Sequence, residues 1–220
     1  MNGSLSARVL VEAIGTFLLA LTIQLVVLRA PDLGTFAPLA VGLMLTALVY
    51  AGGPVSAAMY NPAIVLVFKL GRKFPARECG PYLIAQVVAA LAAAGVALAL
   101  RGPAEIVLEP SAGAIILAEC VFTFALAWVI LQVTAPHSRN NAWSGVAIGF
   151  VVAGGAYAVG TVSGAAFNPA VWLSLAVTGK IHWHTWWMYG LGEVAGVLLA
   201  VGCQRIIEDT PRPCDPTSPS

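Results

Sequence analysis

The spacing of the charged residues constrains the fold of this chain more than any other feature of its sequence. Glu12 and Arg29 enclose 16 uncharged residues, and Glu78 and Arg101 enclose 22. A membrane-spanning helix needs about 20 mostly apolar residues, so each of these runs is close to the length of one span. Of the 220 residues, 59% are apolar and only 10% are charged, whereas soluble domains carry about 25% charged residues. The chain is therefore expected to be an integral membrane protein.

Two longer uncharged runs do not fit a whole number of spans. Asp32 and Lys69 enclose 36 residues, and Arg139 and Lys180 enclose 40. Each run is too long for one span and too short for two spans with a loop, but it fits one span and a half-span of about ten residues. A re-entrant half-span brings non-helical backbone to membrane depth, where it is tolerated only against protein or a water-filled cavity. The pattern therefore favours a channel or a transporter.

We expect an all-α membrane fold with six transmembrane helices and two re-entrant half-helices. The half-helices are predicted at residues 61–70 and 168–177, and turn-forming residues precede them at Ala51-Gly52-Gly53-Pro54 and at Gly160-Thr161-Val162-Ser163-Gly164. Because Glu12 interrupts the first apolar stretch, this stretch is expected to be retained and not cleaved as a signal peptide. The full spans are predicted at residues 6–28, 36–52, 80–100, 112–133, 142–159 and 185–207.

The lysines and arginines are divided unequally between the two sides of this bundle, with eight on one side and three on the other. Cytoplasmic loops carry the excess of positive charge, so both termini are expected in the cytoplasm and the protein in the plasma (inner) membrane. Residues 208–220, rich in Pro, Ser and Thr, are expected to form a disordered cytoplasmic tail. The first side holds Arg8, Lys69, Arg72, Lys73, Arg77, Arg139, Arg205 and Arg212; the second holds Arg29, Arg101 and Lys180.

The chain contains an internal repeat at a single offset of 107 residues. Asn61-Pro62-Ala63 recurs as Asn168-Pro169-Ala170 without a gap. We therefore divide the chain into a first repeat at residues 1–107 and a second at 108–207. Each repeat holds three spans, an odd number, so the second enters the membrane from the opposite side and the repeats are inverted. Other matching pairs are Glu12 with Glu119, Thr16 with Thr123, Tyr50 with Tyr157, Ser56 with Ser163, Tyr82 with Tyr189 and Gln86 with Glu193.

In each repeat an Asn-Pro pair stands at the start of the predicted half-helix. Asn is a favoured N-cap residue and Pro a favoured first helical residue, because that position needs no N–H donor. In an inverted repeat the two half-helix N-termini meet near the midplane, together with the amides of Asn61 and Asn168. Amide N–H groups there can bind water or a solute hydroxyl, and the positive dipole ends oppose cations.

The segments Val55-Ser56-Ala57-Ala58-Met59-Tyr60-Asn61-Pro62-Ala63 and Val162-Ser163-Gly164-Ala165-Ala166-Phe167-Asn168-Pro169-Ala170 resemble the major intrinsic proteins, the family of aquaporins and aquaglyceroporins. The stretches Glu12-Ala-Ile-Gly-Thr-Phe and Glu119-Cys-Val-Phe-Thr-Phe are similar to the first and fourth spans of that family. The resemblance covers residues 8–207. It implies a homotetramer with one pore per protomer and passive flow of uncharged solutes.

The resemblance also assigns roles to individual residues. Asn61 and Asn168 carry over as pore-lining donors within the two Asn-Pro-Ala motifs. Glu12 and Glu119 match acids that brace the re-entrant loops through hydrogen bonds to backbone N–H groups, and the same role is expected here. An intramembrane carboxylate is otherwise a candidate for function, such as proton transfer.

The narrow outer filter of the family falls at four apolar residues of this chain, so the sequence departs here from the family pattern. Most members carry arginine after the second Asn-Pro-Ala, where this chain has Val171. Without that arginine the filter loses a positive charge and a fork of donors. A wider, apolar filter is expected to select by size and neutrality, although such constrictions can also dewet. The four filter positions are Val41, Ala156, Ala165 and Val171.

Two other residues allow more than one interpretation. Glu193 stands where the family often has proline, and a lone carboxylate in a span needs a partner. It can bind a neighbouring helix, form a tetramer contact, or contact solute or act in gating. Met59 stands where many members have histidine, and it can line the inner vestibule or serve only in packing.

We therefore expect a passive channel for small uncharged solutes, such as polyols, urea and neutral metalloid hydroxides like arsenite, together with water. A mainly water-conducting aquaporin and an ion-coupled secondary transporter are the alternatives. With a net charge of +1 the chain has no basic face for nucleic acid. No enzyme, metal site or cofactor is expected, because the four cysteines lack metal-type spacing and the three histidines lie in loops or at a span end. Membrane lipid and further copies of the chain are the expected partners.

Overall fold

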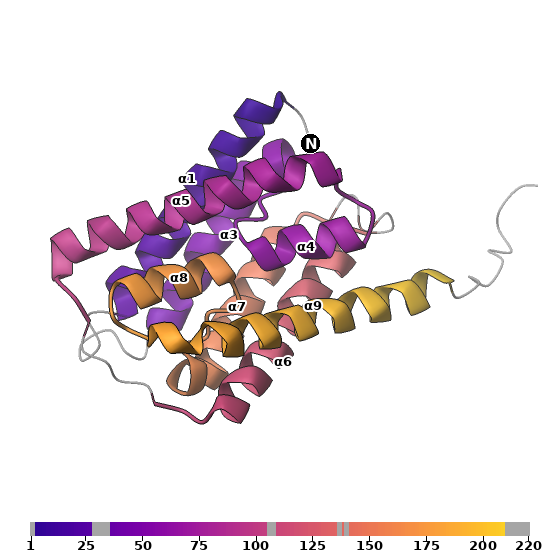
Figure 1. Ribbon diagram of the computed structural model, residues 1–220. Coiled ribbons are helices and arrows are strands. Elements are labelled where there is room, and N and C mark those ends of the chain that lie inside the picture. The colour runs from indigo at the N-terminus through magenta and orange to yellow at the C-terminus, as the bar shows by residue number, and fades with distance from the viewer. Residues whose placement is uncertain (1–2, 28–35, 105–108, 136–137, 139–140, 210–220) are drawn as a thin grey trace, which may run out of the picture.

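The computed structural model describes residues 3–27, 36–104, 109–135, 138 and 141–209, and its regular elements there are all helical (Figure 1). Two short helices, α4 (Pro62–Leu70) and α8 (Pro169–Val177), lie roughly end to end across the middle of the molecule. A short 3-10 helix, η2 (Trp183–Thr185), precedes the last long helix. The long helices are α1 (Leu5–Val27), α3 (Ala37–Ser56), α5 (Ala76–Arg101), α6 (Ala112–Val133), α7 (Ser144–Ser163) and α9 (Trp186–Asp209).

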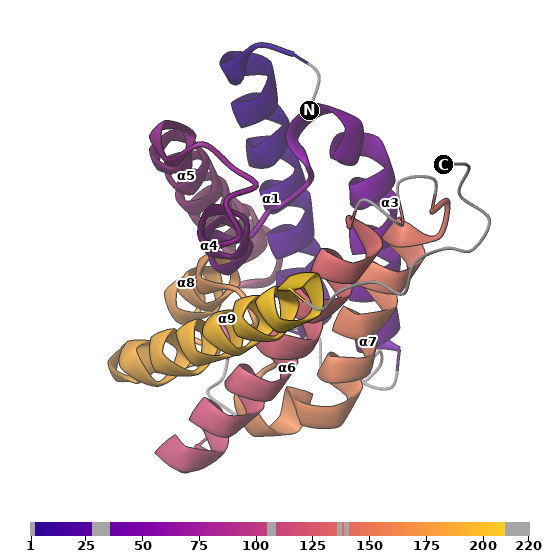
Figure 2. The same ribbon diagram turned by 90° about the vertical axis from the view of Figure 1, so that its right-hand side faces the viewer.

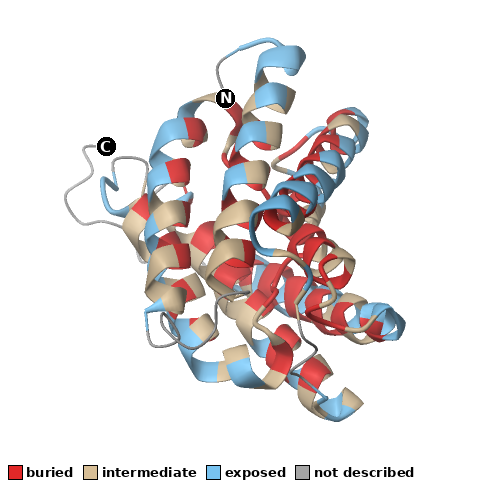
Figure 3. Cartoon of the chain, turned by 90° about the vertical axis from the view of Figure 1, so that its left-hand side faces the viewer, coloured by how far each residue is buried: buried red, intermediate tan, exposed pale blue. Residues whose placement is uncertain are grey.

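Six helical segments of the described chain are long and apolar enough to cross a membrane, namely the five long helices from α1 to α7 and the segment Trp183–Glu208. Their outward faces carry exposed apolar side chains, and their buried residues face the centre (Figure 3). In water such a surface would be unfavourable, but it suits lipid tails. The expected all-α fold, with six transmembrane helices and two re-entrant half-helices in an inverted repeat, is confirmed. The exposed apolar side chains include Leu10, Ile14, Leu43, Ile84, Leu117, Phe150 and Leu198.

The contacts between helices follow the same pattern in both halves. In the first half α1 packs against α3 and α5, and in the second α6 packs against α7 and α9. The halves meet where α3 crosses α7 at Gly42 and Gly149, so closely that a Cβ on Gly42 would lie 2.6 Å from the Gly149 carbonyl oxygen. Each short helix packs against a long helix of the other half, α4 against α9 and α8 against α5. The two short helices also contact each other (Figure 2).

Two long helices extend further than the sequence analysis expected. The span predicted at residues 36–52 continues to Ser56, and the span predicted at 142–159 continues to Ser163. Each helix ends in a left-handed residue, Ala57 with φ 74° and Gly164 with φ 80°. Pro54 lies within the last turn of α3, so the Gly-Gly-Pro sequence is not the turn that we expected. The predicted tail at residues 208–220 lies almost entirely outside the described residues, with α9 reaching Asp209.

Gly52, two residues before Pro54, has a packing role instead. The side chain of Tyr60 fills the space beside Gly15 and Gly52, and a Cβ on either glycine would overlap the Tyr60 side chain. A Cβ on Gly52 would also lie 2.8 Å from a methyl group of Val11. The Tyr60 hydroxyl donates a hydrogen bond to the Leu48 carbonyl oxygen at 3.0 Å. Gly52 therefore lets a buried aromatic residue of the re-entrant loop pack between α1 and α3.

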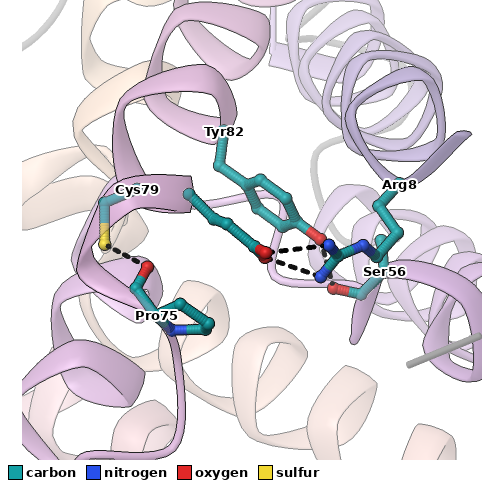
Figure 4. Close-up of polar contacts among 6 residues, drawn as sticks. Arg8, Ser56, Pro75, Cys79 and Tyr82 are labelled. Carbon is teal, nitrogen blue, oxygen red and sulfur yellow. Dashed lines mark hydrogen bonds and ion pairs between the residues drawn. The ribbon is translucent and has the colours of Figure 1, made fainter. Parts of the chain in front are cut away.

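The helix α5 begins at Ala76, four residues before the predicted start of its span at residues 80–100. The predicted span excluded Glu78 because this residue is charged. In the structure, the Arg8 guanidinium forms a bidentate salt bridge with the Glu78 carboxylate, with N–O distances of 2.7 and 3.0 Å (Figure 4). One turn further along α5, the Tyr82 hydroxyl donates to the carbonyl oxygen of Ser56 at 3.0 Å (Figure 4). Pairing of the charges allows the first turn of α5 to pack against α1.

Gly52→Ala should destabilise the protein although alanine is the better helix former. The added methyl group collides with the buried Tyr60, and overpacking of this kind costs about 1–3 kcal/mol. Gly53→Ala is the matched control, since a Cβ at Gly53 meets no atom within 4 Å. Thermal unfolding of the purified protein in detergent should show a lower midpoint for Gly52→Ala and no loss for Gly53→Ala. Equal midpoints would contradict the packing role of Gly52.

Candidate functional site

The two short helices begin with the same cap. Asn61 precedes α4 with extended backbone, and its Oδ1 accepts a hydrogen bond from the Ala63 N–H at 2.8 Å. Asn168 precedes α8 in the same conformation, and its Oδ1 accepts from the Ala170 N–H at 2.9 Å. Proline follows each asparagine, where a backbone N–H is not needed. The sequence Asn-Pro-Ala thus both starts each half-helix and fixes the asparagine side chain.

The amide groups of the same asparagines connect the two repeats. Asn61 Nδ2 donates to the carbonyl oxygen of Phe167 at 2.8 Å, and Asn168 Nδ2 donates to the carbonyl oxygen of Tyr60 at 3.0 Å. Each NH₂ group carries two hydrogens, so one remains for another acceptor. Because both asparagines line a cavity, this second hydrogen can serve a molecule inside it.

Glu12 holds the first loop from behind. Its Oε1 accepts from the Ser56 hydroxyl at 2.7 Å and from the Met59 N–H at 3.0 Å. Its Oε2 accepts from the Tyr60 N–H at 2.7 Å and from Gln86 Nε2 at 2.9 Å. The side chain is fully buried, so these four bonds replace the water that the carboxylate has lost.

Glu119 has the matching position behind the second loop. Its two oxygens accept from the N–H groups of Ala166 at 3.2 Å and Phe167 at 2.7 Å. Both loops include non-glycine residues in the left-handed region, among them Tyr60 with φ 49° and Phe167 with φ 47°. Such a conformation costs of order 1–3 kcal/mol per residue and persists only where the surroundings enforce it. The bonds to Glu12 and Glu119 provide that enforcement.

A cavity of about 340 Å³ runs past both caps. The four residues assigned to the filter from the sequence all line it, although they come from α3, α7, the second loop and α8. Met59 lines it as well. Most of the other lining side chains are apolar. The lining therefore includes Val41, Ala156, Ala165 and Val171, together with the two amides of Asn61 and Asn168.

Three of the acids singled out in the sequence are absent from the described lining of this cavity. Glu12, Glu119 and Glu193 are instead buried in the surrounding protein. Glu193, on α9, is 1% exposed, and neither of its carboxyl oxygens has a hydrogen-bond partner among the described residues.

Lys180 is a cavity residue that the sequence analysis treated only as a loop charge. It follows α8, its side chain is 9% exposed, and it is the one charged residue in the described lining of the cavity. Burial lowers the pKa of its ammonium group below the usual lysine value. The sequence carried one signal for this residue, its position three residues after α8 at the end of the long uncharged run.

A second group that the sequence analysis missed fixes the far end of α8. Gln24 on α1 donates through Nε2 to the Ser174 hydroxyl at 3.0 Å and accepts at Oε1 from the Thr178 hydroxyl at 2.9 Å. All three side chains are buried. The spacing of charged residues does not reveal uncharged polar residues within apolar runs. A glutamine in a span nevertheless needs hydrogen-bond partners, as a charged residue does. This group anchors α8 against the first repeat.

The sequence of this chain matches known proteins over most of its length. A family model described as "Major intrinsic protein" matches residues 2–204. Aquaporin NIP1-1 of Oryza sativa subsp. japonica is 32% identical over 178 residues, which are 78% of this chain and 62% of that protein. The chain thus spans less than two thirds of the length of this plant relative. The protein named "Probable aquaporin AqpM" of Archaeoglobus fulgidus is 29% identical over 236 residues, covering 91% of this chain and 96% of that one.

Among solved structures, the X-ray structure of the aquaglyceroporin from Plasmodium falciparum superposes with a TM-score of 0.79. The match covers 93% of this chain and 97% of that chain, at 19% sequence identity. At this identity the likeness concerns the fold, including the inverted arrangement of three spans and one half-helix per repeat.

Asn168→Asp should weaken the junction between the two loops. An ionised aspartate retains an oxygen to cap α8 but cannot donate to the Tyr60 carbonyl, and a protonated one donates only at the cost of taking up a proton. The cost should be about 1–3 kcal/mol, seen as a lower unfolding midpoint and lower solute flux in proteoliposomes. Asn141→Asp is the matched control, because Asn141 caps Trp143 through Oδ1 at an exposed site. An unchanged midpoint for Asn168→Asp would refute this role.

Proposed function

Because the chain belongs to the major intrinsic protein family, we propose that it is a passive channel for small uncharged solutes larger than water, with water as a further permeant. This family consists of membrane channels and not of enzymes. The solutes that we propose are polyols, urea and neutral metalloid hydroxides such as arsenite. Small neutral molecules of this kind carry hydroxyl or amine groups, which suit the few amide donors in the cavity.

The observation that carries this proposal is the apolar outer part of the cavity. Val41, Ala156, Ala165 and Val171 line it together, and no arginine follows the second Asn-Pro-Ala. Small apolar side chains leave a wide passage and offer water no hydrogen bonds. We propose that these four residues form the filter and that it selects solutes by size and neutrality.

Charge selection is proposed to come from two other sources. The N-termini of α4 and α8 point toward each other, and each carries the positive end of a helix dipole. The Lys180 ammonium adds a full positive charge to the cavity lining. Together they oppose the entry of cations into a passage whose filter has no charge of its own.

The arrangement in the membrane is part of the same proposal. We propose a multi-pass protein of the plasma (inner) membrane with both termini in the cytoplasm, since eight of the eleven basic residues fall on that side. We also propose a homotetramer with one pore per protomer, as the family resemblance implies. Crosslinking in the membrane, followed by sizing, tests the tetramer.

Val171→Arg should convert the filter to a narrower and charged one. The guanidinium group would occupy the passage, so glycerol, urea and arsenite flux should each fall roughly tenfold or more, with water flow affected least. Stopped-flow measurements on proteoliposomes compare the four permeants. Val171→Leu is the control for added volume without charge.

The same measurements of water, glycerol, urea and arsenite flux on the wild-type protein also distinguish the proposed function from the two alternative functions. Water flow with no uptake of glycerol, urea or arsenite would indicate a mainly water-conducting aquaporin and would overturn the proposed solute class. Flux that saturates and requires an ion gradient would indicate a secondary transporter. If Val171→Arg leaves the flux of every solute unchanged, residue 171 is not in the filter.

Lys180→Gln should increase leakage of Na⁺ and K⁺ relative to neutral-solute flux. For an illustrative separation of about 8 Å and an effective dielectric constant of about 20, a unit charge contributes about 2 kcal/mol, so a rise of about thirtyfold is expected. Lys180→Arg keeps the charge and should keep the exclusion. Lys69→Gln removes an equal charge from an exposed site outside the cavity lining and serves as the control. A leak equal to wild type in Lys180→Gln would contradict the assignment.

A further inference from the structure

We propose that Glu193 is a positioning residue whose protonated carboxyl donates a hydrogen bond to Glu119 and so completes the support of the loop before Asn168. This inference concerns the scaffold behind the cavity and goes beyond the proposed function, because it holds for any permeant. It starts from one anomaly: a fully buried acid whose two oxygens have no partner among the described residues.

The first repeat contains the same arrangement with every partner visible. There the Glu12 carboxylate accepts from the Ser56 hydroxyl, the N–H groups of Met59 and Tyr60, and Gln86 Nε2 at 2.9 Å. Gln86 lies on α5 and its bond to Glu12 links α5 to α1. The fourth bond of the set therefore comes from a side-chain donor on the last span of the repeat.

In the second repeat the residue at the Gln86 position is Glu193, and the residue at the Glu12 position is Glu119. Glu119 accepts the two loop N–H groups, of Ala166 and Phe167, and also interacts with the Ser163 hydroxyl. The donor that corresponds to Gln86 Nε2 is missing. An ionised carboxylate only accepts hydrogen bonds, whereas a protonated one has an O–H to donate. A protonated Glu193 can fill this vacancy.

The packing of α9 on α6 brings these two acids together. A Cβ on Gly192 would lie 2.9 Å from the Glu119 Cβ, and a Cβ on Gly196 would lie 2.5 Å from the Cys120 carbonyl oxygen. The helices thus approach at glycines on either side of Glu193. Glu193 therefore lies on a helix in direct contact with the helix that carries Glu119.

Among the described residues, no positively charged group interacts with Glu193. The titratable groups that face it are Glu119 on α6 and Tyr189, one turn earlier on α9. The Tyr189 hydroxyl is engaged with the Ser163 carbonyl oxygen. Two adjacent carboxyl groups that are both buried in protein hold one proton between them, because their charges repel and each charge is costly to bury.

The hydrogen bonds of Glu119 favour Glu193 as the residue that keeps the proton. Both Glu119 oxygens accept backbone N–H groups, and a carboxylate makes those bonds more strongly than a neutral acid. The Asn168 N–H lies near the Glu193 carboxyl without forming a hydrogen bond to it, and this weak interaction with the charged form is smaller than the effects of burial and of the nearby Glu119 charge. The amide oxygen of Gln86 likewise has no partner among the described residues. A protonated Glu193 thus resembles Gln86 at both of its polar atoms.

The protonation state also affects the cavity. An ionised Glu193 would add a second negative charge behind the N-terminus of α8 and would reduce the positive potential there. A neutral Glu193 leaves only the Glu119 charge, so that each half-helix has one carboxylate behind it.

The test uses three variants of the full-length protein in proteoliposomes. Glu193→Gln replaces the protonated acid by an amide of the same shape and should keep both flux and unfolding midpoint. Glu193→Leu has similar volume but no donor, and it should lower the midpoint and reduce flux severalfold, because the buried Glu119 carboxylate loses a hydrogen-bond donor. Gln86→Glu recreates the second-repeat pair in the first repeat and should also keep flux.

Infrared spectroscopy provides a readout that packing alone does not change. Near neutral pH the wild type should show a C=O stretching band of a protonated carboxylic acid that is lost in Glu193→Gln. Gln86→Glu should gain a band of the same kind. A folded Glu193→Gln protein that has lost its flux, or that shows no loss of the acid band, would overturn the proposal. So would an ionised glutamate at position 86 in Gln86→Glu.

Discussion

Hydrogen bonds between two buried carboxylates and the backbone of two loops are the interaction on which the rest of this structure depends. Glu12 and Glu119 hold left-handed residues such as Tyr60 and Phe167 at membrane depth, where lipid offers the peptide groups no hydrogen bonds. Only with these loops in place do the two half-helices start near the midplane. The cavity, its two amide donors and its positive potential all follow from that arrangement.

Much of the fold could be predicted from the sequence, because a bilayer imposes a length on each span and a cost on each charge. The uncharged runs required half-spans, and the Asn-Pro pairs set the starts of α4 and α8. The end of α3 could not be predicted, because Gly52 looks the same whether it makes a turn or makes room for Tyr60. That difference depends on a contact between residues of different segments.

Within the site, the sequence indicated the residues whose roles depend on local pattern or on a family resemblance. For Lys180 the sequence offered only its position at the end of a long uncharged run, which does not reveal burial, because a lysine in a short connection is usually solvated. Nor did it reveal the group formed by Gln24, Ser174 and Thr178, because hydrogen bonds between segments about 150 residues apart leave no local pattern. These features appear only once the two repeats are packed together.

The bonds between the loops also bear on how such a chain is made. Asn61 donates to Phe167 and Asn168 to Tyr60, so each loop is completed by a residue synthesised long before or long after it. During synthesis the first repeat must wait with its loop donor and acceptor unpaired until the second repeat has entered the membrane. The first half-helix is therefore expected to reach its final depth late, in the same step as the second.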